Sequence, residues 1–254
     1  TFVDIAGLVK GASKGEGLGN KFLSHIREVD AVIHLVRCFK SEKITHVNSE
    51  IDPKKDLEII KTEILLSDIE LIQKKLEKSK KKLLHQKEIN LLESKLSELN
   101  SGKEISSNDY EEFKFLSRIG LLSIKPRIIV CNVDESSVSS GNDLTSAIRS
   151  SYPEDKIITV CADIEDQIMS LDKNDREIFM KDIGLNKTGL NKLIKSGYDL
   201  LNLDTFFTSG PEESRAWTIK KNTSAPKAAS VIHTDFEKKF IRAEAVSCED
   251  FIKY

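Results

Sequence analysis

The segment Ile128-Ile129-Val130-Cys131-Asn132-Val133-Asp134-Glu135 decides the fold class of this chain. It opens with an uninterrupted apolar run, which is typical of a strand buried on both faces of a parallel sheet. The polar residues that follow predict a loop at the end of that strand. An ordinary strand-to-loop exit rich in turn formers has the same pattern, so this segment alone leaves two interpretations open.

The tetrapeptide Asn132-Val133-Asp134-Glu135 stands where P-loop GTPases carry the Asn-Lys-x-Asp loop that recognises the base. In that loop the carboxylate accepts hydrogen bonds from two adjacent guanine donors, and the lysine stem supports the base from the side. Here Val133 replaces the lysine and Glu135 the aspartate. A carboxylate one methylene longer no longer sits where it would accept both guanine protons, and the ring acceptor of adenine would repel a close carboxylate. The loop is therefore predicted to bind nucleotides other than GTP.

A second strand-like segment, Phe2 to Leu8, also ends in a polar loop and fits the pattern Asp-x-x-Gly. In phosphoryl-transfer sites of this type the Asp, here Asp4, holds the magnesium shell. The Gly, here Gly7, offers its amide to the terminal phosphate without an intervening side chain. The glycine-rich stretch that follows suits a switch that reorders between nucleotide states, although a plain flexible loop is the alternative. Its spacing excludes a dinucleotide fingerprint. The candidate switch residues are Leu8, Gly11, Gly15, Gly17 and Gly19.

With these motifs in hand, the chain resembles the YchF subfamily of Obg-like ATPases along its whole length. Further motifs occur in the family's order: the string from Val3 to Leu23, then Val36-Arg37-Cys38-Phe39, Cys161-Ala162-Asp163-Ile164-Glu165, Arg215-Ala216-Trp217-Thr218 and His233-Thr234-Asp235-Phe236-Glu237-Lys238. The resemblance implies an α/β fold, namely a P-loop NTPase domain with a mostly parallel sheet, an inserted α-helical coiled-coil hairpin and a C-terminal β-grasp (TGS) domain. It also implies slow, magnesium-dependent ATP hydrolysis and association with the ribosome.

The resemblance assigns further residues to the site. Backbone amides of Cys161, Ala162 and Asp163 would lie along the purine edge. Many GTPases place a glutamine after Asp-x-x-Gly to orient the attacking water, whereas this chain has Leu8, which cannot hydrogen-bond. The family's candidate is a histidine after the second strand, and His46 matches it; a surface loop residue is the alternative. His34, inside an apolar run, is expected to be buried.

The chain departs from the family in lacking Gly-x-x-x-x-Gly-Lys-Ser/Thr, since its Gly102-Lys103 pair is followed by Glu104. It starts at Thr1 on a strand-like segment and stops at Tyr254 inside the expected TGS sheet. We therefore expect a fragment whose first strand, P-loop and magnesium-binding Ser/Thr lie upstream. By itself the chain should bind nucleotide poorly, because backbone amides and a lysine around the phosphates supply much of the affinity of such sites.

The amino-acid composition excludes only a few functional classes of protein. The 254 residues carry 39 basic and 41 acidic side chains, a net charge of -2, so global charge makes no case for nucleic acid. The four cysteines, with neither metal nor disulfide-framework spacing, suit a reduced cytoplasmic protein. No run approaches the roughly 20 apolar residues that cross a bilayer. The expected partners are ATP or ADP, the ribosome and its RNA, with no membrane and no DNA.

Hydrophobic periodicity predicts the domain order. A helix from Lys21 to Glu28 precedes a strand at Ala31 to Val36, which is an α/β signature. Helical spacing then appears from Asp56 to about Leu76 and from about Leu84 to Leu99, which predicts two antiparallel helices. We place the nucleotide-binding domain at 1–52 and 119–201, the helical insertion at 53–118 and the TGS domain at 202–254. The expected stripes are Leu57, Ile60, Ile64 and Leu71 on one helix and Ile89, Leu92, Leu96 and Leu99 on the other.

Lysines gather toward the tip of the predicted hairpin. A basic tip could contact ribosomal RNA phosphates, and a solvated helix end is the alternative. The lysines are Lys74, Lys75, Lys78, Lys80, Lys81, Lys82 and Lys87.

From about Leu203 onward the chain is predicted to form short strands at 205–208, 216–219 and 240–243. His233, Asp235 and Arg242 could form a ligand site, but we expect them to serve in helix capping and surface hydrogen bonding. Trp217 is expected to belong to the core rather than to a base-stacking surface.

Three functions remain open from the sequence. The first is a magnesium-dependent ATPase whose nucleotide state controls its hold on the ribosome. The second is a GTPase of the same fold. The third is a ribosome or RNA adaptor with vestigial hydrolysis.

Overall fold

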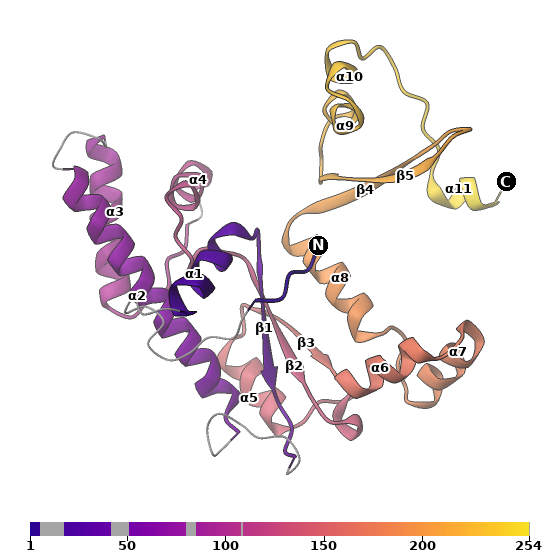
Figure 1. Ribbon diagram of the computed structural model, residues 1–254, viewed down its shortest axis with the longest axis horizontal. Helices are drawn as coiled ribbons and strands as arrows, with labels where there is room; N and C mark the ends of the chain where they lie inside the picture. Colours follow the sequence, from indigo (N-terminus) through magenta and orange to yellow (C-terminus); the bar gives the residue numbers. More distant parts are fainter. Residues whose placement is uncertain (6–17, 42–50, 80–84, 108, 254) are drawn as a thin grey trace. The chain divides into compact units, whose positions relative to one another are not determined.

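The computed structural model describes residues 1–5, 18–41, 51–79, 85–107 and 109–253, and of residues 18–21 the backbone alone (Figure 1). The chain divides into two compact units, Thr1–Gly197 and Tyr198–Tyr254. Each unit is considered by itself.

The first unit is an α/β structure built on a three-stranded parallel sheet in the order β1-β2-β3. Arg37, Asn132 and Val160 are register partners at the carboxyl ends of the three strands, so the loops that follow leave from one edge of the sheet. The elements in chain order are α1 (Leu18–Glu28), β1 (Val32–Arg37), α2 (Pro53–Ser79), α3 (Gln86–Asn100), α4 (Tyr110–Ile119), β2 (Arg127–Asn132), η2 (Glu135–Ser137), α5 (Asp143–Ser151), β3 (Lys156–Val160), α6 (Ala162–Ser170), α7 (Lys173–Asp182) and α8 (Gly189–Leu200), the last of which continues into the second unit.

Strand β2 is buried on both faces, as its apolar run predicts. Four consecutive residues, Ile128 to Cys131, are at most 2% exposed. Side chains of both faces of a central strand are covered in this way only when helices flank the sheet on each side. The sheet core around them contains Val36, Cys38, Leu57, Ile129, Cys131, Val133, Val138, Ile148, Cys161, Ile164, Ile168 and Leu185.

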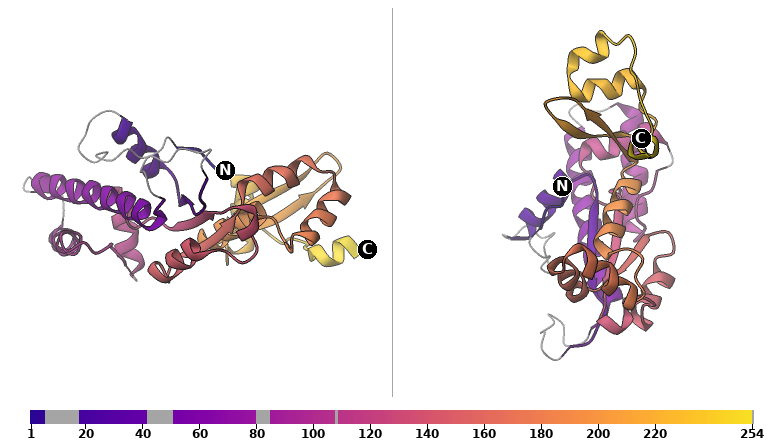
Figure 2. Two further views of the ribbon diagram at one scale, coloured as in Figure 1. Left: turned by 90° about the horizontal axis from the view of Figure 1, so that it is seen from below. Right: turned by 90° about the vertical axis from the view of Figure 1, so that its right-hand side faces the viewer.

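The predicted helical pair is present as α2 and α3, which pack against each other (Figures 1 and 2). The stripe on α3 is confirmed at Leu92 and Leu99, which are buried in the core of the pair. The stripe on α2 is wrong in part. Leu57 belongs to the sheet core and Ile64 packs against α1, whereas Leu65 and Ile72 contact the α3 and α4 side chains. The 27-residue helix α2 therefore contacts three hydrophobic clusters along its length, which a single stripe could not show.

The predicted strand at Phe2 to Leu8 is not found in residues 1–5, which belong to no strand. Phe2 and Val3 are 57% and 64% exposed. An apolar alternation makes a strand only where a neighbouring strand offers a free edge, and none of the described strands pairs with these residues. Residues 6–8 lie outside the described part.

The second unit contains an antiparallel hairpin of β4 (Leu203–Ser209) and β5 (Ser214–Lys220), followed by α9 (Ala225–Ile232), α10 (Thr234–Lys238) and α11 (Cys248–Lys253). The first two predicted strands are thus confirmed. The capping role of His233 is confirmed as well, because its Nδ1 accepts a hydrogen bond of 3.2 Å from the backbone N–H of Asp235 at the start of α10. Trp217 is half-buried in the hairpin and its indole N–H donates to Thr208 at 2.9 Å.

The strand predicted at residues 240–243 is wrong. This segment has no regular structure, and Ile241 is 91% exposed. A segment of four residues forms a strand only where it can pair with the edge of a sheet.

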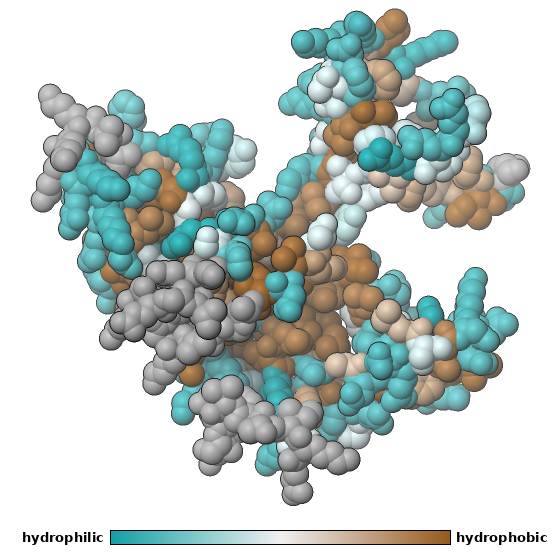
Figure 3. Space-filling model, viewed as in Figure 1, coloured by the Kyte–Doolittle hydropathy of each residue, from teal (hydrophilic) through white to brown (hydrophobic). Residues whose placement is uncertain are grey.

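Hydrophobic residues also lie on the visible face of this unit near α11 (Figure 3), where Phe251 and Ile252 are 65% and 84% exposed. Within the described residues, no helix has the length and apolar content needed to cross a membrane.

Asn142 joins the sheet edge to α5, which suggests a test of the fold. Its side-chain oxygen caps α5 by accepting from Thr145 N at 3.0 Å, and its amide donates to Cys38 O beyond β1 at 2.7 Å. Replacing Asn142 with alanine should lower the free energy of unfolding by about 1–2 kcal/mol, the range of a lost N-cap. Urea denaturation of the variant would measure this. Asn174→Ala, at an exposed position of α7, should change it by less than about 0.5 kcal/mol; equal effects of the two variants would contradict the role of Asn142.

Candidate nucleotide site

The loops after β2 and β3 meet at the carboxyl edge of the sheet, as the sequence motifs require. The side-chain oxygen of Asn132 accepts a hydrogen bond of 3.0 Å from the backbone N–H of Ala162. In the other direction, Val133 N donates to Val160 O at 2.8 Å. These two bonds fix the positions of the base loop, residues 132–135, and of the loop that begins at Cys161.

The four residues of the base loop have different environments. Asn132 is half-buried, whereas Asp134 and Glu135 are exposed. Val133 is 2% exposed and lies in the sheet core. The position that carries a lysine in Asn-Lys-x-Asp loops is thus filled here by an apolar side chain turned into the protein, and its contribution to a ligand is limited to its backbone.

Glu135 begins the short η2 turn and is held by a residue that sequence reasoning missed. Gln167, on α6, donates its side-chain amide to the Oε1 atom of Glu135 at 3.1 Å. The two residues are 32 positions apart, so no local pattern in the sequence indicates the contact. Gln167 thus connects the base loop to the helix that follows β3.

Cys161, Ala162 and Asp163 form the start of α6. Ala162 and Asp163 are exposed, whereas Cys161 is 1% exposed and occupies the N-cap position. Burial raises the pKa of the Cys161 thiol, and the negative charges of Asp163 and Glu135 raise it further. The two predicted loops come together through the hydrogen bond between Ala162 and Asn132. The backbone N–H of Ala162 is already used in this hydrogen bond.

Helix α6 is fixed at its far side as well. The carboxylate of Glu165 accepts hydrogen bonds from Gly189 N at 2.5 Å and Leu190 N at 3.0 Å at the start of α8. A Cβ atom at Gly189 would lie 2.7 Å from a methyl group of Val160, so this close approach needs glycine. With Ile164 and Ile168 buried in the sheet core, α6 presents Asp163 and Gln167 to solvent.

Most of the predicted phosphate and switch residues are not described. Gly7, Leu8, Gly11, Gly15, Gly17 and His46 lie outside the described residues, and Gly19 lies in the first turn of α1. Asp4 is exposed near the start of the chain. Within the described ranges no group of three or more His, Cys, Asp or Glu side chains is arranged to hold a metal ion. Magnesium commonly takes one or two protein carboxylates and completes its shell with phosphate and water, so a single Asp4 carboxylate is compatible with such a site.

The lysines predicted at the hairpin tip are only partly described. Lys74, Lys78 and Lys87 are exposed and Lys75 is half-buried, while residues 80–82 lie outside the described part. Lys74 forms an ion pair with Glu70 one turn away. The described lysines therefore form a basic surface at the end of α2, and the carboxylate of Glu70 neutralises part of its charge.

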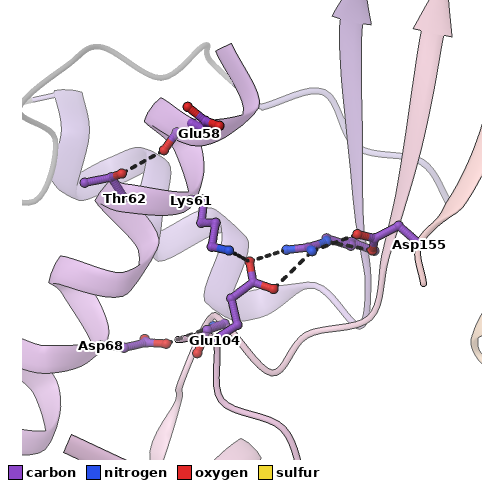
Figure 4. Close-up of polar contacts among 8 residues, drawn as sticks. Glu58, Lys61, Thr62, Asp68, Glu104 and Asp155 are labelled. Atoms are coloured by element: carbon purple, nitrogen blue, oxygen red, sulfur yellow. Dashed lines mark hydrogen bonds and ion pairs between the residues drawn. The ribbon is translucent and has the colours of Figure 1, made fainter. Parts of the chain in front are cut away.

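The opposite, amino-terminal end of the sheet carries an ion-pair network rather than a ligand site (Figure 4). Arg127, at the start of β2, donates to Glu104 at 2.7 Å and to Asp155 at 2.8 Å, and Lys61 on α2 lies 3.5 Å from Glu104. Burial opposes the charge of Arg127, yet its bonds to Asp155 and Glu104 raise its pKa above the ordinary value. The network joins α2 to the sheet.

Comparison with known proteins gives a consistent result. Residues 1–67 match a family described as a 50S ribosome-binding GTPase, and residues 203–254 match a C-terminal YchF GTPase family described as a protein of unknown function. A relative named ribosome-binding ATPase YchF from Bacillus subtilis is 46% identical over 264 residues, covering 99% of this chain and 72% of the relative. The protein of the same name from Haemophilus influenzae is 43% identical over 261 residues, covering 100% of this chain and 72% of the relative.

A solved structure is similar as well. The structure of the Schizosaccharomyces pombe YchF GTPase superimposes with a TM-score of 0.79 at 35% sequence identity, covering 92% of this chain. The chain spans 66% of that protein, just under two thirds of its length.

Proposed function

Because the chain belongs to the YchF family, we propose that it is part of a ribosome-associated, magnesium-dependent nucleotide hydrolase that prefers ATP to GTP. The names of the relatives, which describe ribosome-binding ATPases, support the activity and the partner. The observation that carries the base preference is the environment of the base loop. Val133 is turned into the core, and one oxygen of Glu135 is engaged by Gln167. Two elements favour guanine in an Asn-Lys-x-Asp loop, namely the lysine stem and a carboxylate free to accept from both guanine donors. This arrangement offers neither of them.

Each residue has a distinct role in the proposed mechanism. Magnesium, when bound, neutralises charge on the phosphates. Asp4 would hold it through water, and the amide of Gly7 would meet the terminal phosphate. His46 would position the attacking water in place of Leu8. The glycines at 11, 15, 17 and 19 would permit the switch segment to reorder with the nucleotide state, which alters the hold on the ribosome.

A GTPase of the same fold is the second candidate, because the matched family and the solved relative are both described as GTPases. A calorimetric titration of ADP and of GDP, each with magnesium, distinguishes the two. The titration uses the protein with its phosphate-binding loop present. We expect ADP to bind at least about tenfold more tightly than GDP, equivalent to about 1.4 kcal/mol. Equal or reversed affinities would exclude the ATP preference.

The same protein tests the third hypothesis, an adaptor without a working nucleotide cycle. Ribosome binding that responds to ATP, measured by co-sedimentation, supports the hydrolase. Ribosome binding by the nucleotide-free protein that depends on salt but not on added ATP would favour the adaptor, since contacts with RNA phosphates weaken as salt rises.

A further inference from the structure

Gln167 lies beside the base loop in a position that affects which base Glu135 can bind. Its amide nitrogen is 3.1 Å from Glu135 Oε1, and both side chains are exposed at the carboxyl edge of the sheet. No sequence motif assigns this glutamine a role. The question is what the contact does to the hydrogen-bonding capacity of the carboxylate.

A free carboxylate has two oxygens that can each accept a hydrogen bond, which matches the two adjacent donors of guanine. When Gln167 donates to Oε1, it occupies one lone pair of that oxygen and holds the carboxylate toward α6, which weakens the paired arrangement. Guanine presents two adjacent donors, so a carboxylate held in this way matches guanine less well than a free carboxylate does.

The position of Gln167 is well defined by its surroundings. Ile164 and Ile168 are buried in the sheet core, and Glu165 binds the backbone of α8. The base loop is fixed to the same helix through Asn132 and Ala162. Separate contacts therefore hold the backbone on which each of the two side chains stands.

We propose that Gln167 is a positioning residue that sets base specificity by engaging Glu135 and so weakening guanine nucleotides relative to adenine nucleotides. This inference rests on the proposed function, since it assigns the base loop to a nucleotide. It differs from that function in naming a residue on α6 as the source of the discrimination.

The test uses the protein with its phosphate-binding loop present and compares the ratio of the GDP and ADP dissociation constants, with magnesium, between the wild type and Gln167→Met. Methionine keeps the length of the side chain and removes the amide. We expect the ratio to fall by about 3- to 10-fold, as for the loss of one hydrogen bond near a charge. Gln167→Ala should give the same shift. The matched control is Gln73→Met, at an exposed position of α2, which should leave the ratio unchanged.

A second background separates a specific effect from a structural one. With Glu135→Ala already present, Gln167→Met should no longer change the ratio, since the carboxylate that it positions is absent. Equal thermal stability of the variants would confirm that folding is intact. A ratio that falls equally in both backgrounds would contradict the positioning role.

The outcomes distinguish this inference from the proposed function. If the wild-type protein prefers ADP and the ratio is the same in Gln167→Met as in Gln73→Met, the inference is wrong and the proposed function stands. If the wild-type protein does not prefer ADP but the ratio still falls in Gln167→Met alone, the ATP preference is wrong and the inference stands. Absence of binding by either nucleotide would overturn both.

Discussion

Replacing Asp68 with alanine is expected to lower the free energy of unfolding by about 2–4 kcal/mol. Asp68 is fully buried on α2, and its carboxylate accepts hydrogen bonds from Leu122 N at 2.9 Å and from Ser123 N at 2.8 Å. Leu122 is itself 3% exposed, so alanine would leave its N–H without a partner or water. A buried donor without a partner costs most of its desolvation energy.

The gain from these hydrogen bonds is reduced by the burial of the charge. Burial raises the pKa of the Asp68 carboxyl, while hydrogen bonds from Ser123 and Leu122 oppose the shift. The expected loss is therefore smaller than the sum of separate charged hydrogen bonds. Asp68→Asn should give an intermediate loss, because it retains one acceptor oxygen and removes the charge.

Urea denaturation monitored by circular dichroism measures these changes. The matched control is Glu70→Ala, which removes an exposed carboxylate from the same helix and only an i,i+4 pair with Lys74. It should change stability by less than about 0.5 kcal/mol. A loss in Asp68→Ala no larger than in this control would show that the carboxylate does not hold the 122–123 turn against α2.

The sequence predicted well those elements whose pattern of residues lies within a short segment of the chain. The apolar run at Ile128 to Val130 indicated β2 because a central parallel strand needs apolar side chains on both faces. Ala31 to Val36 indicated β1, found at Val32–Arg37, although this strand is only partly buried and Leu35 is 66% exposed. His233 was predicted as a cap, and it caps α10. In each case the information lies within a few residues.

The elements that sequence missed depend on distant partners. The segments at 1–5 and 240–243 contain aromatic and β-branched residues typical of strands, yet this composition does not reveal whether a sheet edge is free to pair with them. The stripe on α2 was wrong because the helix contacts one core near Leu57 and another near Ile72. The periodicity of a helix shows which face is apolar, but not where its partner changes.

The candidate site divides in the same way. Asn132 and Cys161 were predicted from motifs at strand ends, and parallel register brings their loops together. The burial of Val133 and the contact of Gln167 with Glu135 could not be predicted, since both depend on the packing of α6 against the sheet. The roles of Asp4, Gly7 and His46 remain predictions from the motifs.

Titration of His34 should make the protein less stable in mild acid. His34 faces α2 from β1, is 9% exposed, and its Nδ1 atom has no hydrogen-bond partner among the described residues. Burial, and after it the charge of Arg127, lower its pKa from 6.5 to about 4, against smaller opposing effects of Asp155 and Glu104. The adjoining cavity of about 20 Å³ has room for about one water molecule, which cannot replace the hydration of an imidazolium ion.

Because the folded pKa lies below the unfolded one, the contribution of His34 is complete above pH 6.5 and is lost as the pH falls toward 4. We expect this loss to reach about 3 kcal/mol at pH 4. His34→Leu, which cannot titrate, should be less sensitive to pH by that amount, measured as urea unfolding free energies at pH 7, 5.5 and 4. His25→Gln, at an exposed position of α1, should follow the wild-type curve. Parallel curves for the wild type and His34→Leu would mean that the imidazole is hydrated in the folded protein, and that the α2 end of the sheet opens to water more readily than its packing indicates.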